Sequence, residues 1–370
     1  MHFNLSESNQ LNMKLLVITQ KVDKNDDVLG FFHGWIRELA KSVNQLIVIC
    51  LEKGEYNLPE NVKVLSLGKE RPDKTQGRAG DIARLGYVWN FYKHIWQERK
   101  NYDAVLVHMN KEYVILGGLL WRLTGKRIML WYNHKKGNWL SSLAGRLAST
   151  IFYTSPFSYF SGWKKAKIMP AGIDTNLHRL KPDAQAPKNS LLSLGRISPV
   201  KNLDVLIGAG EILESAGVDF TLNIAGAPGK GDEKYYNDLR EECRALEKKG
   251  RIKFLGSVPN RETPAVFNAS EIFINLTDSG SLDKTTLEAM ASERLVLASN
   301  KTFEKIFPRE WHEAMIFKEG DANDLSRKII KLMAMEEGEK NAIKKESRKI
   351  VIENHSLVIL IDKILAYLKN

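Results

Sequence analysis

The chain has 370 residues, which is too long for one ordinary hydrophobic core and suits two α/β domains. Its 43% hydrophobic and 27% charged residues are typical of a globular protein and exclude a disordered one. No apolar run approaches the roughly 20 residues that cross a bilayer. The polar start, MHFNLSESNQLN, lacks the apolar core of a signal peptide. Cys50 and Cys243 fall in segments with core patterns, so we expect a soluble protein of the reducing cytoplasm.

The net charge of +11 is concentrated in one half of the chain. Residues 1–180 contain 26 Lys and Arg against 15 Asp and Glu, whereas residues 181–370 contain 29 of each. This asymmetry favours an anionic partner for the first half, and solvated surface charge is the alternative. A lipid surface, a phosphate-bearing acceptor and nucleic acid are the candidates. Because no nucleic-acid-binding module is present, we expect no nucleic acid and a peripheral position on the inner face of the cell membrane.

The first half alternates β-branched runs with helical patterns, which is typical of βαβ units around a parallel sheet. Helices are predicted for 31–42 and 82–100. Strands are predicted for 14–19, 45–51, 62–67, 104–108, 127–132 and 167–170. We therefore expect an N-terminal Rossmann-like, acceptor-side domain over residues 1–180.

A Pro-rich polar stretch, 181–189, is predicted to be an interdomain linker. A second series of strands follows at 190–195, 221–225, 252–255, 272–276 and 295–298, and the tail, 324–335 and 342–369, has a helical pattern. We expect a C-terminal Rossmann-like donor domain over 190–345, and a final helix over 346–370 that packs back on the first domain. The predicted fold class is α/β, with two doubly wound domains facing across a cleft.

The segment GRISPVKNLDVLI follows the first strand of the second half. Gly195 allows a sharp turn at the strand end, after which Arg196 and Lys201 project from one loop. A planar guanidinium and a point-like ammonium both suit a diphosphate. The alternative is an ordinary solvated loop between strand and helix.

A second candidate site is SGSLDKTTLEAMA, residues 279–291. Its glycine and serine stand where a helix begins, so free backbone amides there can face a phosphate. Glu288 lies inside that helix, where its carboxylate can accept bonds from two ribose hydroxyls. The donor-binding set that we predict in this segment is Gly280, Ser281, Asp283, Lys284 and Glu288.

Together these segments resemble glycosyltransferase family 4, the retaining enzymes with two Rossmann-like domains (GT-B). The matching segments are GIDTNLH, LGRISPVKNLDVLI, LNIAGAPGKGDEKYYNDL, IKFLGSVPN and GSLDKTTLEAMAS. The resemblance implies that Arg196 and Lys201 bind the donor diphosphate. It also implies that Glu288, the last Glu of the family's E-x7-E motif, binds the ribose.

The chain departs from the family pattern at Gly280, which stands where the first Glu of that motif is expected. The carboxylate that usually holds the transferred sugar is therefore missing. Asp278 or Asp283 could replace it from the same loop. The departure leaves the identity of the sugar open.

In the first half, His134 follows a predicted strand in LWYNH, where the family has an active-site histidine near the sugar and acceptor. His108, which also ends a strand, is its competitor for that role. Gly30 stands in the position of the family's glycine loop, where the backbone can approach a phosphate or the acceptor. We therefore predict His134, Arg196 and Lys201 as the catalytic set, and we add Gly30 and Gly195 to the donor-binding set.

The predicted helix 82–100 carries two groups of apolar residues. The group at helical spacing, which we expect to be buried, is Ile82, Leu85, Trp89, Tyr92 and Trp96. Tyr87, Phe91, Arg84 and Lys93 lie off that stripe and could form a basic and aromatic face for a membrane interface.

The chain lacks a phosphate-loop motif, a dinucleotide fingerprint, a nucleophile elbow and a D-x-D pair. We therefore expect transfer from a UDP- or GDP-sugar to a glycan or lipid-linked acceptor, with no obligatory cofactor or metal. Retention follows from the resemblance, and cell-surface polysaccharide or glycolipid synthesis is the expected role. A nucleotide-sugar epimerase, a sugar phosphorylase or a non-catalytic nucleotide-sugar binding protein are the alternatives.

Overall fold

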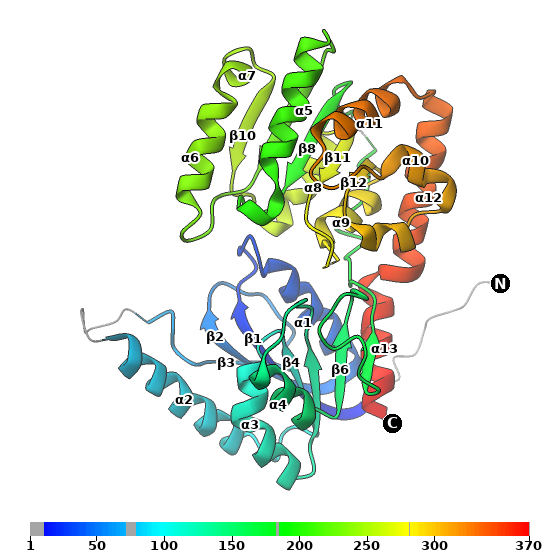
Figure 1. Ribbon diagram of the computed structural model, residues 1–370. Helices are drawn as coiled ribbons and strands as arrows, with labels where there is room; N and C mark the ends of the chain where they lie inside the picture. Colours follow the sequence, from blue (N-terminus) through cyan, green and yellow to red (C-terminus); the bar gives the residue numbers. More distant parts are fainter. Residues whose placement is uncertain (1–10, 72–78, 183–184, 281, 370) are drawn as a thin grey trace, which may run out of the picture. The chain divides into compact units, whose positions relative to one another are not determined.

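A computed structural model describes residues 11–71, 79–182, 185–280 and 282–369 (Figure 1). The chain divides into two compact units, residues 1–169 with 360–370 and residues 170–359. Each unit contains one parallel sheet with helices packed against it, so the predicted α/β class with two doubly wound domains is confirmed.

The sheet of unit 1 has seven strands in the order β3-β2-β1-β4-β5-β6-β7, and all its neighbouring strands pair in parallel. The strand order reverses between β1 and β4, and such a reversal is where ligands bind in doubly wound sheets. The strands are β1 (Leu11–Val22), β2 (Val43–Lys53), β3 (Val62–Ser66), β4 (Ala104–His108), β5 (Arg127–Trp131), β6 (Thr150–Tyr153) and β7 (Ala166–Ile168).

Four helices connect these strands and cover the sheet of unit 1: α1 (Gly30–Ser42), α2 (Ala79–Gln97), α3 (Lys111–Leu123) and α4 (Trp139–Leu147). Helix α1 buries Phe32, Trp35 and Ile36, which recur at helical spacing on one face. The end of α13 (Leu357–Lys369) belongs to the same unit, where Tyr367 packs on Phe152 and Arg127 donates to the Leu368 carbonyl.

The sheet of unit 2 has five parallel strands in the order β10-β9-β8-β11-β12, with the reversal between β8 and β11. The strands are β8 (Ser190–Leu194), β9 (Thr221–Ala225), β10 (Ile252–Gly256), β11 (Ile272–Asn275) and β12 (Leu295–Ala298). The α-helices are α5 (Leu203–Ser215), α6 (Glu233–Glu242), α7 (Arg244–Lys248), α8 (Thr263–Asn268), α9 (Lys284–Ala291), α10 (His312–Met315), α11 (Ala322–Ala334) and α12 (Glu337–His355). Four 3-10 turns complete the unit: η1 (Pro199–Lys201), η2 (Asn260–Glu262), η3 (Lys301–Lys305) and η4 (Arg309–Trp311).

The sequence boundaries of the two units differ from the domain boundaries that we predicted. The first unit ends at Met169 and not at residue 180, and residues 346–359 belong to unit 2. The stretch predicted as a linker is attached to unit 2 at both its ends. The backbone amide of Lys181 donates to the Asn268 side chain, and that of Asn189 donates to Glu271. Bonds of this kind satisfy the polar backbone of a Pro-rich segment without a helix or strand.

The predicted burial of α2 is wrong. The exposed fractions of Leu85, Trp89, Tyr92 and Trp96 are 70%, 72%, 40% and 53%, and the side chain of Ile82 lies outside those described. Phe91 and Ile95 are the buried residues, and Phe91 packs against Tyr113 and Trp121 of α3. The helix is apolar on two faces, so its periodicity alone could not select the face that turns inward.

Candidate donor-binding site

The loops that carry the predicted donor residues of unit 2 leave β8 and β11 at their carboxyl ends. These two strands are neighbours in the sheet and flank the reversal of strand order. Residues 195–202 follow β8, and residues 276–283 follow β11. The topology of unit 2 therefore brings both motifs to the edge where parallel sheets bind ligands.

Glycines hold the loop after β8 close to the loop after β9. Gly195 has a φ of +149° and Gly226 a φ of +145°, both in the region that favours glycine. A Cβ atom on Gly226 would lie 1.9 Å from the Gly195 carbonyl oxygen. A Cβ on Gly229 would lie 2.9 Å from Cδ of Arg196, so the Arg196 side chain runs over this second loop. The close approach of the two loop backbones thus fixes the position of Arg196, while its side chain remains exposed.

Lys201 joins the loop after β8 to the loop after β11. Its ammonium donates to Thr277 Oγ1 at 3.0 Å and forms an ion pair with Asp283. Thr277 in turn donates to Asp283 at 2.8 Å, and Asp283 caps α9 by accepting from the amide of Thr285. Burial alone would raise the pKa of Asp283, but the Lys201 charge and these hydrogen bonds hold it well below its usual range.

The loop after β11 shows where the missing Glu would have stood. Gly280 has a φ of +143°, a conformation that a glutamate side chain rarely adopts. The Asp283 side chain is only 9% exposed and is engaged by Lys201, whereas Asp278 is exposed and accepts a hydrogen bond from Asn202 at 2.7 Å. Ser281, which we placed in the donor-binding set, lies outside the described residues.

Helix α9 contributes two buried charged residues to this edge. Burial lowers the pKa of Lys284 to about 7, although the nearby carboxylate of Glu288 acts in the opposite direction. The carboxylate of Glu288 also lies 3.8 Å from Nε2 of buried His178. Burial lowers the pKa of His178, which favours its neutral form.

Sequence reasoning assigned no role to His178 or to Thr277. His178 lies in the segment GIDTNLH, whose match to the family pattern marked its position without its contact to Glu288. Thr277 carried no signal, because its role arises from hydrogen bonds to residues of two other segments.

In unit 1 the loop after β1 leads into α1 through Gly30, which is buried and begins the helix. The Gly30 amide donates to the Asp26 carbonyl at 3.1 Å. The Asp26 side chain accepts from the amides of Val28 and Leu29, at 2.9 and 2.7 Å. The amides that lead into α1 are therefore engaged within the loop itself.

The two candidate histidines have different surroundings. His108 is buried, stacks on Phe32 at 4.1 Å between ring centroids and lies 3.4 Å from Thr19 Oγ1. His134 follows β5, keeps an exposed side chain and contacts the Tyr132 ring edge-on. Partial burial and the positive charge of Lys111 lower the pKa of His134, which favours the neutral form of the ring. Its exposure makes His134 the better candidate to meet a sugar hydroxyl.

Each unit also contains a cavity of its own. In unit 1 a cavity of about 400 Å³ lies between α2 and α3, beside Gln20 near the end of β1 and Leu51 near the end of β2. Its aromatic and apolar lining includes Tyr87, Phe91, Tyr113 and Leu116, with Arg84 and Glu112 as charged members.

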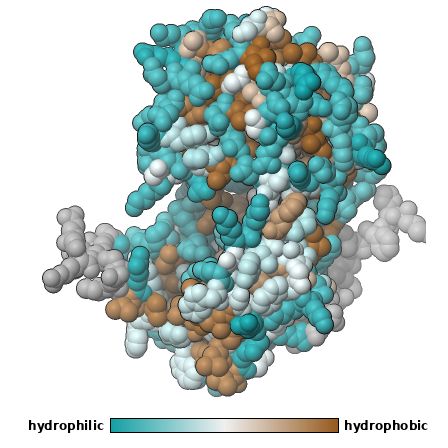
Figure 2. Space-filling model, viewed as in Figure 1, coloured by the Kyte–Doolittle hydropathy of each residue, from teal (hydrophilic) through white to brown (hydrophobic). Residues whose placement is uncertain are grey.

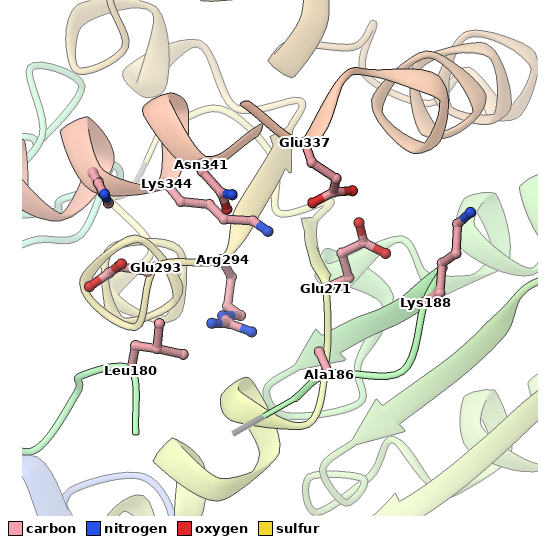
Figure 3. A pocket seen from close by; sticks show the side chains of 10 residues that line it. Leu180, Ala186, Lys188, Glu271, Glu293, Arg294, Glu337, Asn341 and Lys344 are labelled. Atoms are coloured by element: carbon pink, nitrogen blue, oxygen red, sulfur yellow. The ribbon is translucent and has the colours of Figure 1, made fainter. Parts of the chain in front are cut away.

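In unit 2 a cavity of about 610 Å³ lies beside Glu271 and Arg294, which precede β11 and β12 (Figure 3). Figure 3 shows Glu337, Asn341 and Lys344 of α12 lining it as well. This cavity is at the amino ends of the strands and so is separate from the edge that carries the donor motifs.

Residues 174–350 match the family model described as glycosyl transferases group 1. Over 151 residues the chain is 30% identical to an alpha-monoglucosyldiacylglycerol synthase of Streptococcus pneumoniae, a match that covers 37% of this chain and 33% of that protein. It is 26% identical over 143 residues to a mannosylfructose-phosphate synthase of Agrobacterium fabrum, covering 35% and 31%. Each match therefore spans about a third of the length of the curated relative.

Solved structures resemble the chain over nearly its whole length. HepE of Anabaena, crystallised with UDP and glucose, has a TM-score of 0.74 at 18% identity, over 97% of this chain and 100% of that one. Sucrose-phosphate synthase of Thermosynechococcus elongatus has a TM-score of 0.74 at 14% identity, over 96% and 98%. Among the described helices none is long and apolar enough to cross a membrane. Unit 2 therefore matches the group 1 glycosyl transferase family over most of its length, and the whole chain shares the two-domain GT-B fold of these solved structures.

Proposed function

We propose that the chain transfers a sugar from a nucleoside diphosphate sugar to an acceptor hydroxyl. The observation that carries this proposal is the arrangement of Arg196, Lys201 and the start of α9 at one edge of the unit 2 sheet. Two cations and a helix N-terminus there suit a diphosphate. Their main task is to stabilise the negative charge that develops on the leaving diphosphate.

Glu288 is the proposed ribose ligand. It is buried in α9, and two ribose hydroxyls could donate hydrogen bonds to its carboxylate, which lies 3.8 Å from Nε2 of His178. The transferred sugar requires a different group, because Gly280 offers no side chain. Asp278 fits this role better than Asp283, since Asp278 is exposed and Asp283 is committed to Lys201.

In the proposed reaction the acceptor oxygen bonds to the anomeric carbon, and the bond from that carbon to the diphosphate oxygen breaks. The nucleoside diphosphate leaves with the electron pair and takes up the acceptor proton. Retention of configuration, with attack from the face of departure, is proposed from the family resemblance. His134 is proposed to hydrogen-bond a sugar or acceptor hydroxyl, and Gly30 to let the loop after β1 approach the substrate.

The donor is proposed to be a UDP- or GDP-sugar, and the step is proposed to need no metal. HepE was crystallised with UDP-glucose, which supports a nucleotide-sugar donor. The acceptor is proposed to be a glycan or a lipid-linked molecule in cell-surface polysaccharide or glycolipid synthesis. The aromatic cavity of unit 1 and the diacylglycerol-linked product named for the pneumococcal relative support an acceptor with an apolar part.

The test is a screen of UDP-, GDP- and ADP-sugars by thermal shift, followed by mass spectrometry of products formed with lipid extracts and without added metal. With the best donor, we expect Arg196→Ala to reduce turnover about 100-fold, since it removes a contact to the leaving group. Arg261→Ala is the matched control, because Arg261 is an exposed arginine of the same unit that forms an ion pair with Glu262. Equal turnover in the two variants would refute the assignment.

A further inference from the structure

An apolar face of unit 1 is exposed on α2 and continues on α3. On α2 it consists of the four residues Leu85, Trp89, Tyr92 and Trp96, which recur every three or four positions and so share one side of the helix. On α3 it includes Leu119 and Leu123, exposed by 64% and 78%. We call these six residues the α2–α3 face. Figure 2 shows hydrophobic surface at the lower left and bottom of the molecule, where Figure 1 places α2 and α3.

The two helices are held together, so the α2–α3 face is one surface. The hydroxyl of Tyr92 donates to the Leu116 carbonyl of α3 at 2.9 Å. On the inner side Phe91 packs on Tyr113 and Trp121. The exposed side chains are therefore the outer side of helices whose other side is anchored in the core. A contiguous group of exposed tryptophan and leucine side chains on one unit marks an interaction site rather than an ordinary solvated face.

Positive charges outnumber negative charges around the α2–α3 face. Residues 84–100 contain Arg84, Lys93, Arg99 and Lys100 and a single acid, Glu98, which is buried and paired with Lys63. Residues 111–127 contain four more cations and one acid, the exposed Glu112 in the first turn of α3. The Arg99 guanidinium lies 4.3 Å from the centre of the Trp96 ring, so a positive charge stands directly beside an exposed aromatic ring.

We propose that the α2–α3 face docks the protein on the surface of an anionic lipid bilayer. Tryptophan, tyrosine and leucine insert at the level of the headgroups, and the surrounding Lys and Arg residues contact lipid phosphates. A second copy of the chain is the rival occupant, but two such faces would bring their cations together with too few acids to match them. The positive charge around the α2–α3 face therefore favours an anionic bilayer over a second copy of the chain as its partner.

The face differs from the one that the sequence suggested, since Phe91 is in the core and Tyr87 is partly buried. Lys93 is exposed beside the α2–α3 face, as predicted for the membrane interface. The apolar part of the face is the stripe of α2 that we had predicted to be buried. Docking requires no donor and no transfer reaction, so it can hold or fail independently of the proposed activity.

Flotation with vesicles tests the proposal. The full chain is mixed with vesicles of phosphatidylcholine alone or with about 30 mol% phosphatidylglycerol, an anionic content that sets up a negative surface potential. We expect the wild-type chain to float with the anionic vesicles, and to do so less as salt is raised. Trp89→Ser/Trp96→Ser is expected to weaken the partition by about tenfold or more, since two inserting rings are lost. Trp139→Ser is the matched control, because Trp139 is 73% exposed on α4 of the same unit.

A charge variant provides a second measurement that leaves the apolar stripe intact. Lys93→Glu/Lys100→Glu is expected to weaken binding to the anionic vesicles by about twentyfold, at about fivefold for each lysine lost. Lys305→Glu/Arg309→Glu makes the same change of charge at exposed positions of unit 2 and should leave binding within about twofold of the wild type. Circular dichroism checks that each variant is folded.

Failure of the wild-type chain to float, or equal flotation of the face variants and their controls, would overturn the proposal. A concentration-dependent dimer in analytical ultracentrifugation that Trp89→Ser/Trp96→Ser abolishes, without any vesicle binding, would assign the face to a second copy instead. If the tryptophan variant does not fold, quenching of wild-type tryptophan fluorescence by brominated lipids decides the matter. Strong quenching supports insertion, and its absence contradicts it.

Discussion

Lys201 has a structural task as well as the proposed contact to the donor, and the two can be separated. Its ammonium neutralises Asp283, which is buried at the start of α9 and whose pKa is held far below the usual range. Lys201→Met would leave this carboxylate in the protein interior without its counter-ion. Removing one partner of a buried pair costs about 3 kcal/mol or more, because the other charge stays desolvated. Lys201 is itself partly exposed, which places our expectation at the lower end of that range.

The expected loss corresponds to a fall of about 6–12 °C in the melting temperature of a domain of 150–250 residues. Asp283→Asn in the Lys201→Met background should restore most of it, since asparagine caps a helix as well as aspartate and carries no charge. Donor binding should stay weak in this double variant by about tenfold or more, because the contact of Lys201 to the diphosphate is still missing. Calorimetric unfolding and titration with UDP or GDP measure the two effects.

The pH dependence of Lys201→Met gives an internal check. In the wild type the lowered pKa of Asp283 contributes stability above the unfolded pKa, and this is lost as pH falls through the folded value. Without Lys201 the pKa of Asp283 rises, so protonation relieves the buried charge and the deficit relative to wild type shrinks in acid. A variant as stable as wild type at pH 7, or a double variant with no recovery, would refute this account of Asp283.

Two more predictions follow from α9 and from the glycine loops. Burial lowers the pKa of Lys284 from 10.5 to about 7, so the unfolded chain binds more protons between these values and the free energy of unfolding rises with pH across this window. Lys284→Met should remove that rise in urea titrations at pH 7–9.5, and an unchanged slope would contradict the burial of a neutral lysine. Gly226→Ala would place a Cβ 1.9 Å from the Gly195 carbonyl and should abolish nucleotide binding in calorimetry, whereas Gly338→Ala in α12 meets open space and should retain it.

The sequence was sufficient where one signal dominated. Strands β4, β9 and β12 have the predicted bounds, because each is a short run of mainly apolar residues. Strand β6 was missed. Residues 342–369 were predicted as one helical stretch, but Ser356 adopts an extended conformation and divides it into α12 and α13. Both parts have helical periodicity, so the pattern alone does not reveal the break.

The candidate donor site could be predicted in its location and less so in its contacts. Arg196 and Lys201 follow a strand, and Glu288 lies in a helix, as the motifs indicated. The pairing of Lys201 with Asp283 joins residues far apart in sequence, and only the order of strands brings them together. Asp283 was accordingly considered as a sugar ligand, although its carboxylate is engaged by Lys201, Thr277 and Thr285.

The positive charges of the two units have different surroundings at the two surfaces that we propose to bind anions. In unit 2, Lys201 forms an ion pair with Asp283, and buried Lys340 forms one with Glu271. A buried pair is screened little by salt, so it can keep a fixed geometry for a diphosphate. In unit 1 Lys93 and Lys100 stand exposed beside an apolar face. Such cations act through solvent, where attraction to a charged surface adds up over many residues and needs no fixed partner. We therefore propose that the two units suit different anions, a nucleotide beside the paired Lys201 and an extended lipid surface beside the exposed Lys93 and Lys100.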